Sequence, residues 1–161
     1  MKFNILTKIK SKIHRLKGST IIQFGHPRSG CTLIYNILKD IFNDRFVETR
    51  HYYREKDKKF PTVVTYRHPL DSISSSILRY GLKPTNETIK QQIIEFEKNG
   101  IRKIIEIKDN KNVLMLKYED FFDNFEVIFN SFEKFFNITI SSSLRKLIKE
   151  RYSISSVEQI I

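Results

Sequence analysis

The chain has 161 residues, enough for one globular domain with a substantial hydrophobic core. Its 29 lysines and arginines exceed its 18 acidic residues, and the formal charge of +11 favours an anionic partner. No apolar run approaches the roughly 18–20 residues of a membrane span, and no zinc-finger spacing, aromatic RNA-binding signature or helix-turn-helix pattern occurs, so we expect neither a transmembrane segment nor a nucleic-acid partner.

Residues 1–19 form a basic N-terminal segment. Apolar residues recur at helical spacing from Ile5 to Leu16, and the lysines between them exclude a secretory signal. The pattern predicts a basic helix that packs on the core or frays, and the alternative is a peripheral helix on a membrane surface.

The single cysteine cannot form an internal disulfide, so we expect a cytoplasmic location. Residues 20–161 are predicted to form a single domain.

From residue 20, strand-like and helix-like stretches alternate. Short apolar runs with strand composition occupy 20–24, 62–66 and 113–117, and a brief extended piece begins at 46–47. Helical patterns occupy 31–42, 71–80 after Pro69, 85–108 with Gly100 as a candidate break, 123–136, 142–151 and 153–161. This alternation predicts an α/β fold with a parallel sheet covered by helices on both faces. In such sheets ligands bind beyond the carboxyl ends of the strands.

The stretch GHPRSGCT, residues 25–32, joins the first predicted strand to the first predicted helix. Gly25 and Gly30 stand at the spacing of the phosphate-binding loop G-x-x-x-x-G-K-[ST]. Cys31 replaces the lysine that nucleotide-hydrolysing loops require, and no predicted strand ends in an aspartate suited to magnesium. Such a junction still presents backbone N–H groups and a helix N-terminus to an anion. The sequence therefore predicts a metal-free anion site in which Arg28 holds a terminal anionic group.

Two further segments follow the loop. In YRHPLDSISS, residues 66–75, Arg67 ends a predicted strand and Ser75 comes about two helical turns later, so both can bind one dianion. A surface ion pair between Arg67 and Asp71 is the alternative. VLMLKYED, residues 113–120, is a strand followed by a turn, in which the tyrosine and the first acidic residue are interpreted as structural.

The three segments resemble the motifs of sulfotransferases that use 3′-phosphoadenosine 5′-phosphosulfate (PAPS). HPRSGCTL is similar to the family's P-R-S-G-T-T-L loop, the Arg67 segment to its 3′-phosphate motif, and VLMLKYED to its V-L-x-L-x-Y-E-D turn. The resemblance covers 20–125 and implies a three-layer, P-loop-like fold that transfers a sulfuryl group from PAPS to a hydroxyl or amine of a small molecule or glycan. The product would be adenosine 3′,5′-bisphosphate (PAP), and no metal would be required. The cofactor-binding residues that it implies are Gly25, His26, Pro27, Arg28, Ser29, Gly30, Cys31, Thr32, Arg67 and Ser75.

The resemblance offers two candidates for the general base that takes the acceptor's proton. Glu48 belongs to a Glu-Thr-Arg pattern similar to that of Golgi-type enzymes, and His51 aligns with the catalytic histidine of cytosolic enzymes. We prefer Glu48 because the loop is also of the Golgi type, and Arg28 is the candidate for stabilising the leaving phosphate.

The chain also departs from the family's pattern at two places. Cytosolic enzymes stack adenine on a tryptophan where this chain has Leu33, and they carry a C-terminal Arg-Lys-Gly segment that nothing after residue 125 matches. The alternatives to a sulfotransferase are therefore a P-loop-fold protein that binds anions without catalysis and a nucleotide kinase.

Overall fold

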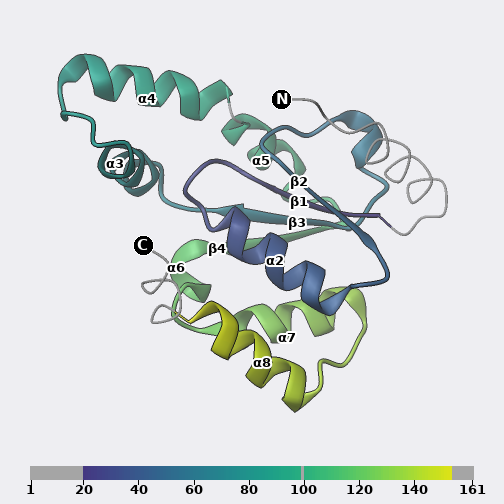
Figure 1. Ribbon diagram of the computed structural model, residues 1–161. Coiled ribbons are helices and arrows are strands. Elements are labelled where there is room, and N and C mark those ends of the chain that lie inside the picture. Colours follow the sequence, from purple (N-terminus) through teal and green to yellow (C-terminus); the bar gives the residue numbers. More distant parts are fainter. Residues whose placement is uncertain (1–19, 99, 154–161) are drawn as a thin grey trace, which may run out of the picture.

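The computed structural model describes residues 20–98 and 100–153. The expected basic segment 1–19 and nearly all of the expected last helix lie outside these residues. Four strands form one parallel sheet in the order β2-β1-β3-β4 (Figure 1). They are β1 (Thr20–Gly25), β2 (Phe46–Arg50), β3 (Thr62–Tyr66) and β4 (Val113–Lys117). The predicted α/β fold is therefore confirmed.

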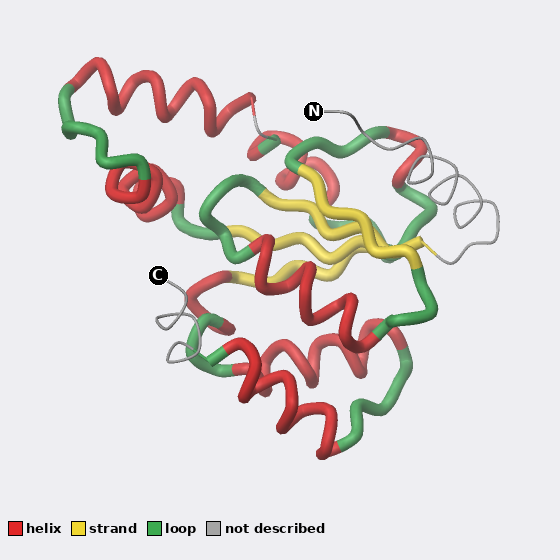
Figure 2. The backbone as a smooth tube through the Cα atoms, viewed as in Figure 1, coloured by secondary structure: helices red, strands yellow, loops and turns green. Residues whose placement is uncertain are grey.

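Helices lie on both faces of the sheet, which gives three layers (Figures 1 and 2). One face is covered by α2 (Cys31–Ile41), α7 (Phe125–Phe136) and α8 (Ser142–Tyr152). On the other side lie the short helix η1 (Glu55–Asp57), α4 (Asn86–Lys98) and α5 (Ile101–Ile107). Two helices begin where strands end: α3 (Pro69–Arg79) follows β3, and α6 (Tyr118–Phe121) follows β4.

The central strand β1 is buried along its whole length, because successive side chains enter two different cores. Ile21 packs with Phe129 and Phe132 in the core beneath α2, α7 and α8. Its neighbour Ile22 packs with Ile104 in the core beneath α5. The central strands β1 and β3 are buried along nearly their whole length rather than at alternate residues, as a sheet covered on both faces requires.

The element bounds agree closely with those expected from the sequence, and the long helical pattern at 85–108 is a broken pair. Gly100 separates α4 from α5 with a backbone φ of 91°, a conformation that L side chains rarely adopt. The sequence missed the short helices η1 and α6. None of the helices in the described part of the chain has the length and apolar character needed to cross a bilayer.

Candidate functional site

The glycine loop lies between the carboxyl end of β1 and the first turn of α2, where the sequence placed it. Gly30 caps α2, and the preceding Arg28 has a φ of 65°, in the left-handed region. A non-glycine residue in that region costs of order 1 kcal/mol or more, and such strain is characteristic of ligand-binding turns. The turn leaves the side chain of Arg28 exposed beside the N-terminus of α2.

The floor of the loop is fixed to β3 by buried contacts. The Ser29 hydroxyl donates to the carbonyl oxygen of His26 over 2.7 Å and lies 3.0 Å from the hydroxyl of Thr65. Gly25 stands opposite Thr65 in the ladder between β1 and β3. A Cβ atom at Gly25 would lie 2.6 Å from the carbonyl oxygen of Thr65 and 2.9 Å from Cys31 Sγ. Only glycine therefore allows the loop to approach β3 this closely.

His26 is fully buried and joins the loop to the end of β3. Its Nε2 accepts a hydrogen bond from the backbone N–H of Arg67 over 3.0 Å, so the proton is on Nδ1, which donates to the Pro27 carbonyl oxygen over 2.9 Å. The ring also packs on Phe96, with 4.3 Å between ring centroids. Burial lowers the pKa of His26 below its ordinary value of 6.5, which favours this neutral form.

One cavity of about 420 Å³ brings together the two arginines that the sequence singled out. Arg28 and Arg67 both line it, and Arg28 Nε donates to Ser75 Oγ over 3.0 Å. No acidic side chain is among its lining residues, which are Pro27, Arg28, Gly30, Cys31, Thr32, Leu33, His51, Arg67, Ser75, Arg79, Tyr80 and Tyr118. The arrangement suits a ligand that carries more than one negative charge.

Arg67 retains unused hydrogen-bonding capacity. Its guanidinium carbon lies 4.4 Å from the centroid of the Tyr118 ring, and its ion-pair partner is Glu119 at 3.7 Å rather than Asp71. The Nε atom of Arg67 is buried and has no hydrogen-bond partner among the described residues. A buried donor of this kind carries a free-energy cost unless a ligand satisfies it.

His51 follows β2 and lines the same cavity beside Cys31. Its Nδ1 lies 2.7 Å from the carbonyl oxygen of Gly25, to which it donates. A hydrogen bond with the Cys31 thiol is the main cause that raises the pKa of His51 above 6.5. Burial alone would raise the pKa of Cys31, but hydrogen bonds from His51 and Ser29 outweigh it and the thiol pKa is lowered. The pairing therefore favours the protonated form of His51, and the imidazole can accept a proton only at a pH above its raised pKa.

Glu48 is not among the cavity-lining residues and belongs to an ion-pair network instead. Glu48 accepts from Arg50 Nε over 2.8 Å, and Arg50 Nη1 lies 2.6 Å from Asp57 Oδ2. The Asp57 side chain is completely buried and also accepts from the backbone N–H of Arg54. This network joins β2 to η1 and holds the chain on both sides of His51.

Several residues that line the cavity were not predicted from the sequence. Arg79, Tyr80 and Tyr118 line the cavity but were not among the predicted binding residues. Arg79 stands four residues after Ser75, on the same face of α3, and this helical spacing was a usable signal. Within 20–98 and 100–153, no cluster of three or more side chains is arranged to hold a metal ion.

Comparison with known proteins identifies a solved structure with a similar fold. No protein-family model and no curated protein matches the sequence. Among solved structures, the chain is similar to the crystal structure of the mouse sulfotransferase SULT7A1 complexed with PAP, with a TM-score of 0.69 and 20% sequence identity. The match covers 88% of this chain and 66% of that one, so the chain spans just under two thirds of its length. The chain therefore has the α/β fold of a sulfotransferase, which confirms the architecture that the loop and the two later segments implied.

Proposed function

We propose that the chain is a PAPS-dependent sulfotransferase. The observation that carries the proposal is the single cavity in which the N-terminus of α2, Arg28, Arg67 and Ser75 converge with no acidic lining residue. A bisphosphorylated ligand matches this charge distribution better than a single phosphate does. The likeness of the fold to a sulfotransferase complexed with PAP supports the same ligand class.

The residues present fit such a ligand. The backbone N–H groups at the start of α2 and the Arg28 guanidinium would hold the 5′-phosphosulfate, and Arg67 with Ser75 would hold the 3′-phosphate. The buried Nε of Arg67 supports this assignment, because it lies 3.7 Å from Glu119, has no hydrogen-bond partner among the described residues, and could donate to an anion. When bound, PAPS supplies the sulfuryl group for transfer. His26 would act as a positioning residue, since it holds the backbone of Arg67 at the end of β3.

His51 is the better candidate for the general base, in contrast to the preference drawn from the sequence. It lines the arginine cavity, whereas Glu48 is engaged with Arg50. The imidazole would take the proton of the acceptor's hydroxyl or amine while Arg28 offsets the negative charge that develops on the leaving phosphate. No step of this scheme requires a metal ion.

A calorimetric titration with PAP tests the binding half of the proposal. We expect binding with a dissociation constant in the micromolar range, weakened at least about tenfold by Arg67→Ala, which removes a charge-assisted contact. Arg102→Ala is the matched control, because this exposed arginine on α5 does not line the cavity and its ion-pair partner among the described residues is Glu97. Absence of PAP binding would favour the anion-binding alternative, and magnesium-dependent ATP binding would favour a kinase.

A labelled-sulfate transfer assay tests the catalytic half. The panel of acceptors should include small alcohols, amines and glycans, with PAPS as donor. We expect His51→Ala to reduce the rate by at least about 10²-fold, the usual contribution of a general base, while Glu48→Gln retains most of it. The opposite ranking of these two variants would return the catalytic role to Glu48.

A further inference from the structure

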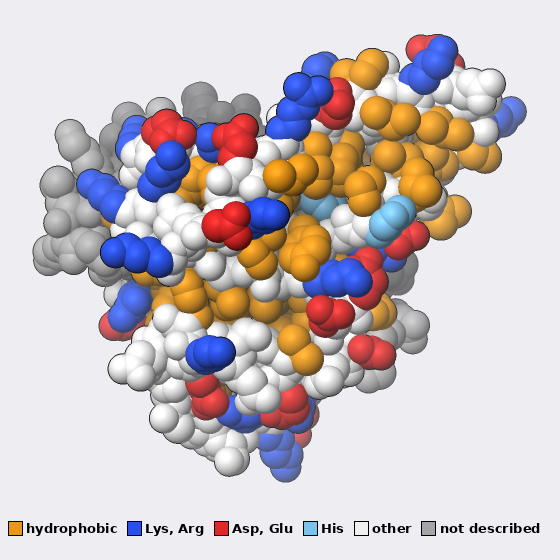
Figure 3. Space-filling view, turned by 180° about the vertical axis from the view of Figure 1, so that it is seen from behind, with side chains coloured by type: hydrophobic (Ala, Val, Ile, Leu, Met, Phe, Trp, Pro, Cys, Tyr) orange, Lys and Arg blue, Asp and Glu red, His pale blue; other side chains and the backbone are white. Residues whose placement is uncertain are grey.

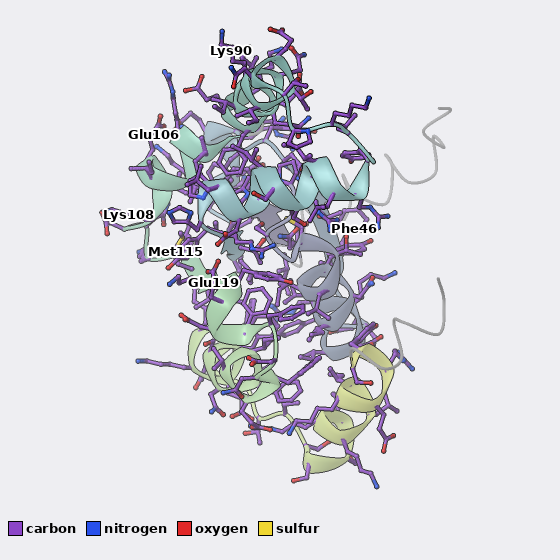
Figure 4. The ribbon with its side chains drawn as sticks, turned by 90° about the vertical axis from the view of Figure 1, so that its left-hand side faces the viewer. Phe46, Lys90, Glu106, Lys108, Met115 and Glu119 are labelled. Atoms are coloured by element: carbon purple, nitrogen blue, oxygen red, sulfur yellow. The ribbon has the colours of Figure 1, made fainter. Side chains whose placement is uncertain are left out.

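A second, larger cavity of about 690 Å³ lies along the β4 edge of the sheet and shares Arg67 with the first. It is built by α5, the ends of β3 and β4, and the start of α3. Figure 4 shows Lys108, Met115 and Glu119 on this side of the molecule, away from Phe46 on β2. Its volume falls within the range of about 300–1,000 Å³ typical of small-molecule sites.

The walls of this groove are mostly apolar. Ile101, Ile104 and Ile105 come from one face of α5, at the spacing that places side chains together on a helix, and Met115 faces them from β4. Ile105 is 62% exposed although it lines a concave surface. Figure 3, which views this side, shows hydrophobic side chains gathered across the middle of the face. The groove therefore offers apolar contact area that the described residues leave uncovered.

The groove also has two unpaired cations. Lys108 at the end of α5 and Lys117 at the end of β4 both line it, and neither forms an ion pair with any described residue. The other charged groups in the lining are Arg67 and Glu119, which pair with each other, and Asp71 at the first turn of α3. The positive charge that remains available is therefore that of the two lysines.

We propose that this groove binds an anionic amphiphile, a molecule with a flexible apolar chain and a carboxylate head. The chain would lie on the isoleucines of α5 and Met115, and the head would lie between Lys108 and Lys117. Three strand spacings, about 14 Å in all, separate β2, which precedes His51, from β4. The two cavities meet at Arg67, and the lysines of the groove lie on the far side of that residue from His51. The proposed ligand is therefore distinct from the sulfuryl acceptor.

Titration of the full chain with dodecanoate, a twelve-carbon carboxylate, tests this proposal by calorimetry. We expect saturable binding that weakens at least about tenfold in Ile105→Asp and in the double variant Lys108→Glu/Lys117→Glu. The matched controls are Ile94→Asp and Lys90→Glu, exposed positions on α4 that do not line the groove, and both should bind dodecanoate as the wild type does. Dodecyltrimethylammonium, which has the same chain and a cationic head, should bind at least about tenfold more weakly than dodecanoate.

Three results would overturn the proposal: no saturable binding, equal binding of the cationic analogue, or groove variants that bind like the controls. The variant Arg28→Ala distinguishes the two cavities, because Arg28 lines the first cavity and does not line the groove. Dodecanoate affinity should be unchanged in that variant, and its loss would assign the carboxylate to the first cavity. The outcome does not depend on whether the chain binds PAP.

Discussion

The buried imidazole of His26 should make the stability of the fold depend on pH near neutrality. Its pKa is lowered by burial, so the unfolded chain, in which the group has its ordinary pKa near 6.5, binds a proton more readily than the native state does. The contribution of His26 to the free energy of unfolding is therefore fully present above pH 6.5, and it is lost as the pH falls below that value. The loss has a maximum slope of about 1.4 kcal/mol per pH unit.

Replacement by alanine removes both the group and its contacts. At pH 7.5, His26→Ala leaves the N–H of Arg67 and the carbonyl of Pro27 without their partners and opens a cavity against Phe96. Two buried polar groups and a lost ring together correspond to about 3–4 kcal/mol of destabilisation. At pH 5.5 the difference in unfolding free energy between wild type and variant should shrink by up to about 1.4 kcal/mol. Only the wild type has an imidazole at this position, and its protonation in the unfolded chain lowers the stability of the native state.

Urea unfolding followed by circular dichroism at both pH values measures this difference. The other three histidines are the same in both proteins, so the comparison isolates the contribution of His26. His26→Gln is the conservative variant, since its amide oxygen can accept from the N–H of Arg67, and it should cost less than the alanine at pH 7.5. A wild type–alanine difference that is the same at pH 7.5 and pH 5.5 would refute the assignment of a neutral, buried imidazole.

Three further predictions concern the glycine loop, the ion-pair network of Asp57, and the His51–Cys31 pair. Gly25→Ala should lower the unfolding free energy by more than about 2 kcal/mol, measured by urea denaturation, because its Cβ would overlap the backbone of β3. Asp57→Asn should cost about 2 kcal/mol in the same assay, since it removes the charge of one of the two carboxylates that pair with the buried Arg50; an effect below about 1 kcal/mol would contradict this. If His51 is the base, kcat/KM should rise with pH through a pKa above 6.5, and Cys31→Ala should move that pKa downward.

The layers of the fold could be predicted because the pattern of apolar residues is strong where the sheet is covered on both faces. The runs TVVTY at 62–66 and VLMLK at 113–117 have the composition of buried strands, and they match β3 and β4. The short helices η1 and α6 were missed, since helices of three or four residues have no periodicity to detect. The strand order could not be read from local patterns at all, because it depends on which crossover passes over which face.

The site was predictable to the extent that its residues belong to contiguous motifs. Arg28, Arg67 and Ser75 come together as expected, because the loop and the Arg67 segment follow adjacent parallel strands. The choice between Glu48 and His51 could not be made from sequence, since it depends on which face of β2 and which side of its end each side chain occupies. The directions of the β2 side chains follow from its pairing with β1, in which Glu48 stands opposite Ile22 and Arg50 opposite Phe24.

The hydrogen bonds that assemble the arginine cavity connect the loop to β3 and α3 across long stretches of chain. Ser29 with Thr65, His26 with Arg67, and Arg28 with Ser75 are separated by 36, 41 and 47 residues. An anion in the cavity contacts all of these segments at once. Because unfolding separates them, the anion binds the folded state and not the unfolded chain. Saturation at one hundred times the dissociation constant should therefore raise the unfolding free energy by about 2.7 kcal/mol, so that a shift in melting temperature reports occupancy even for a ligand that undergoes no reaction.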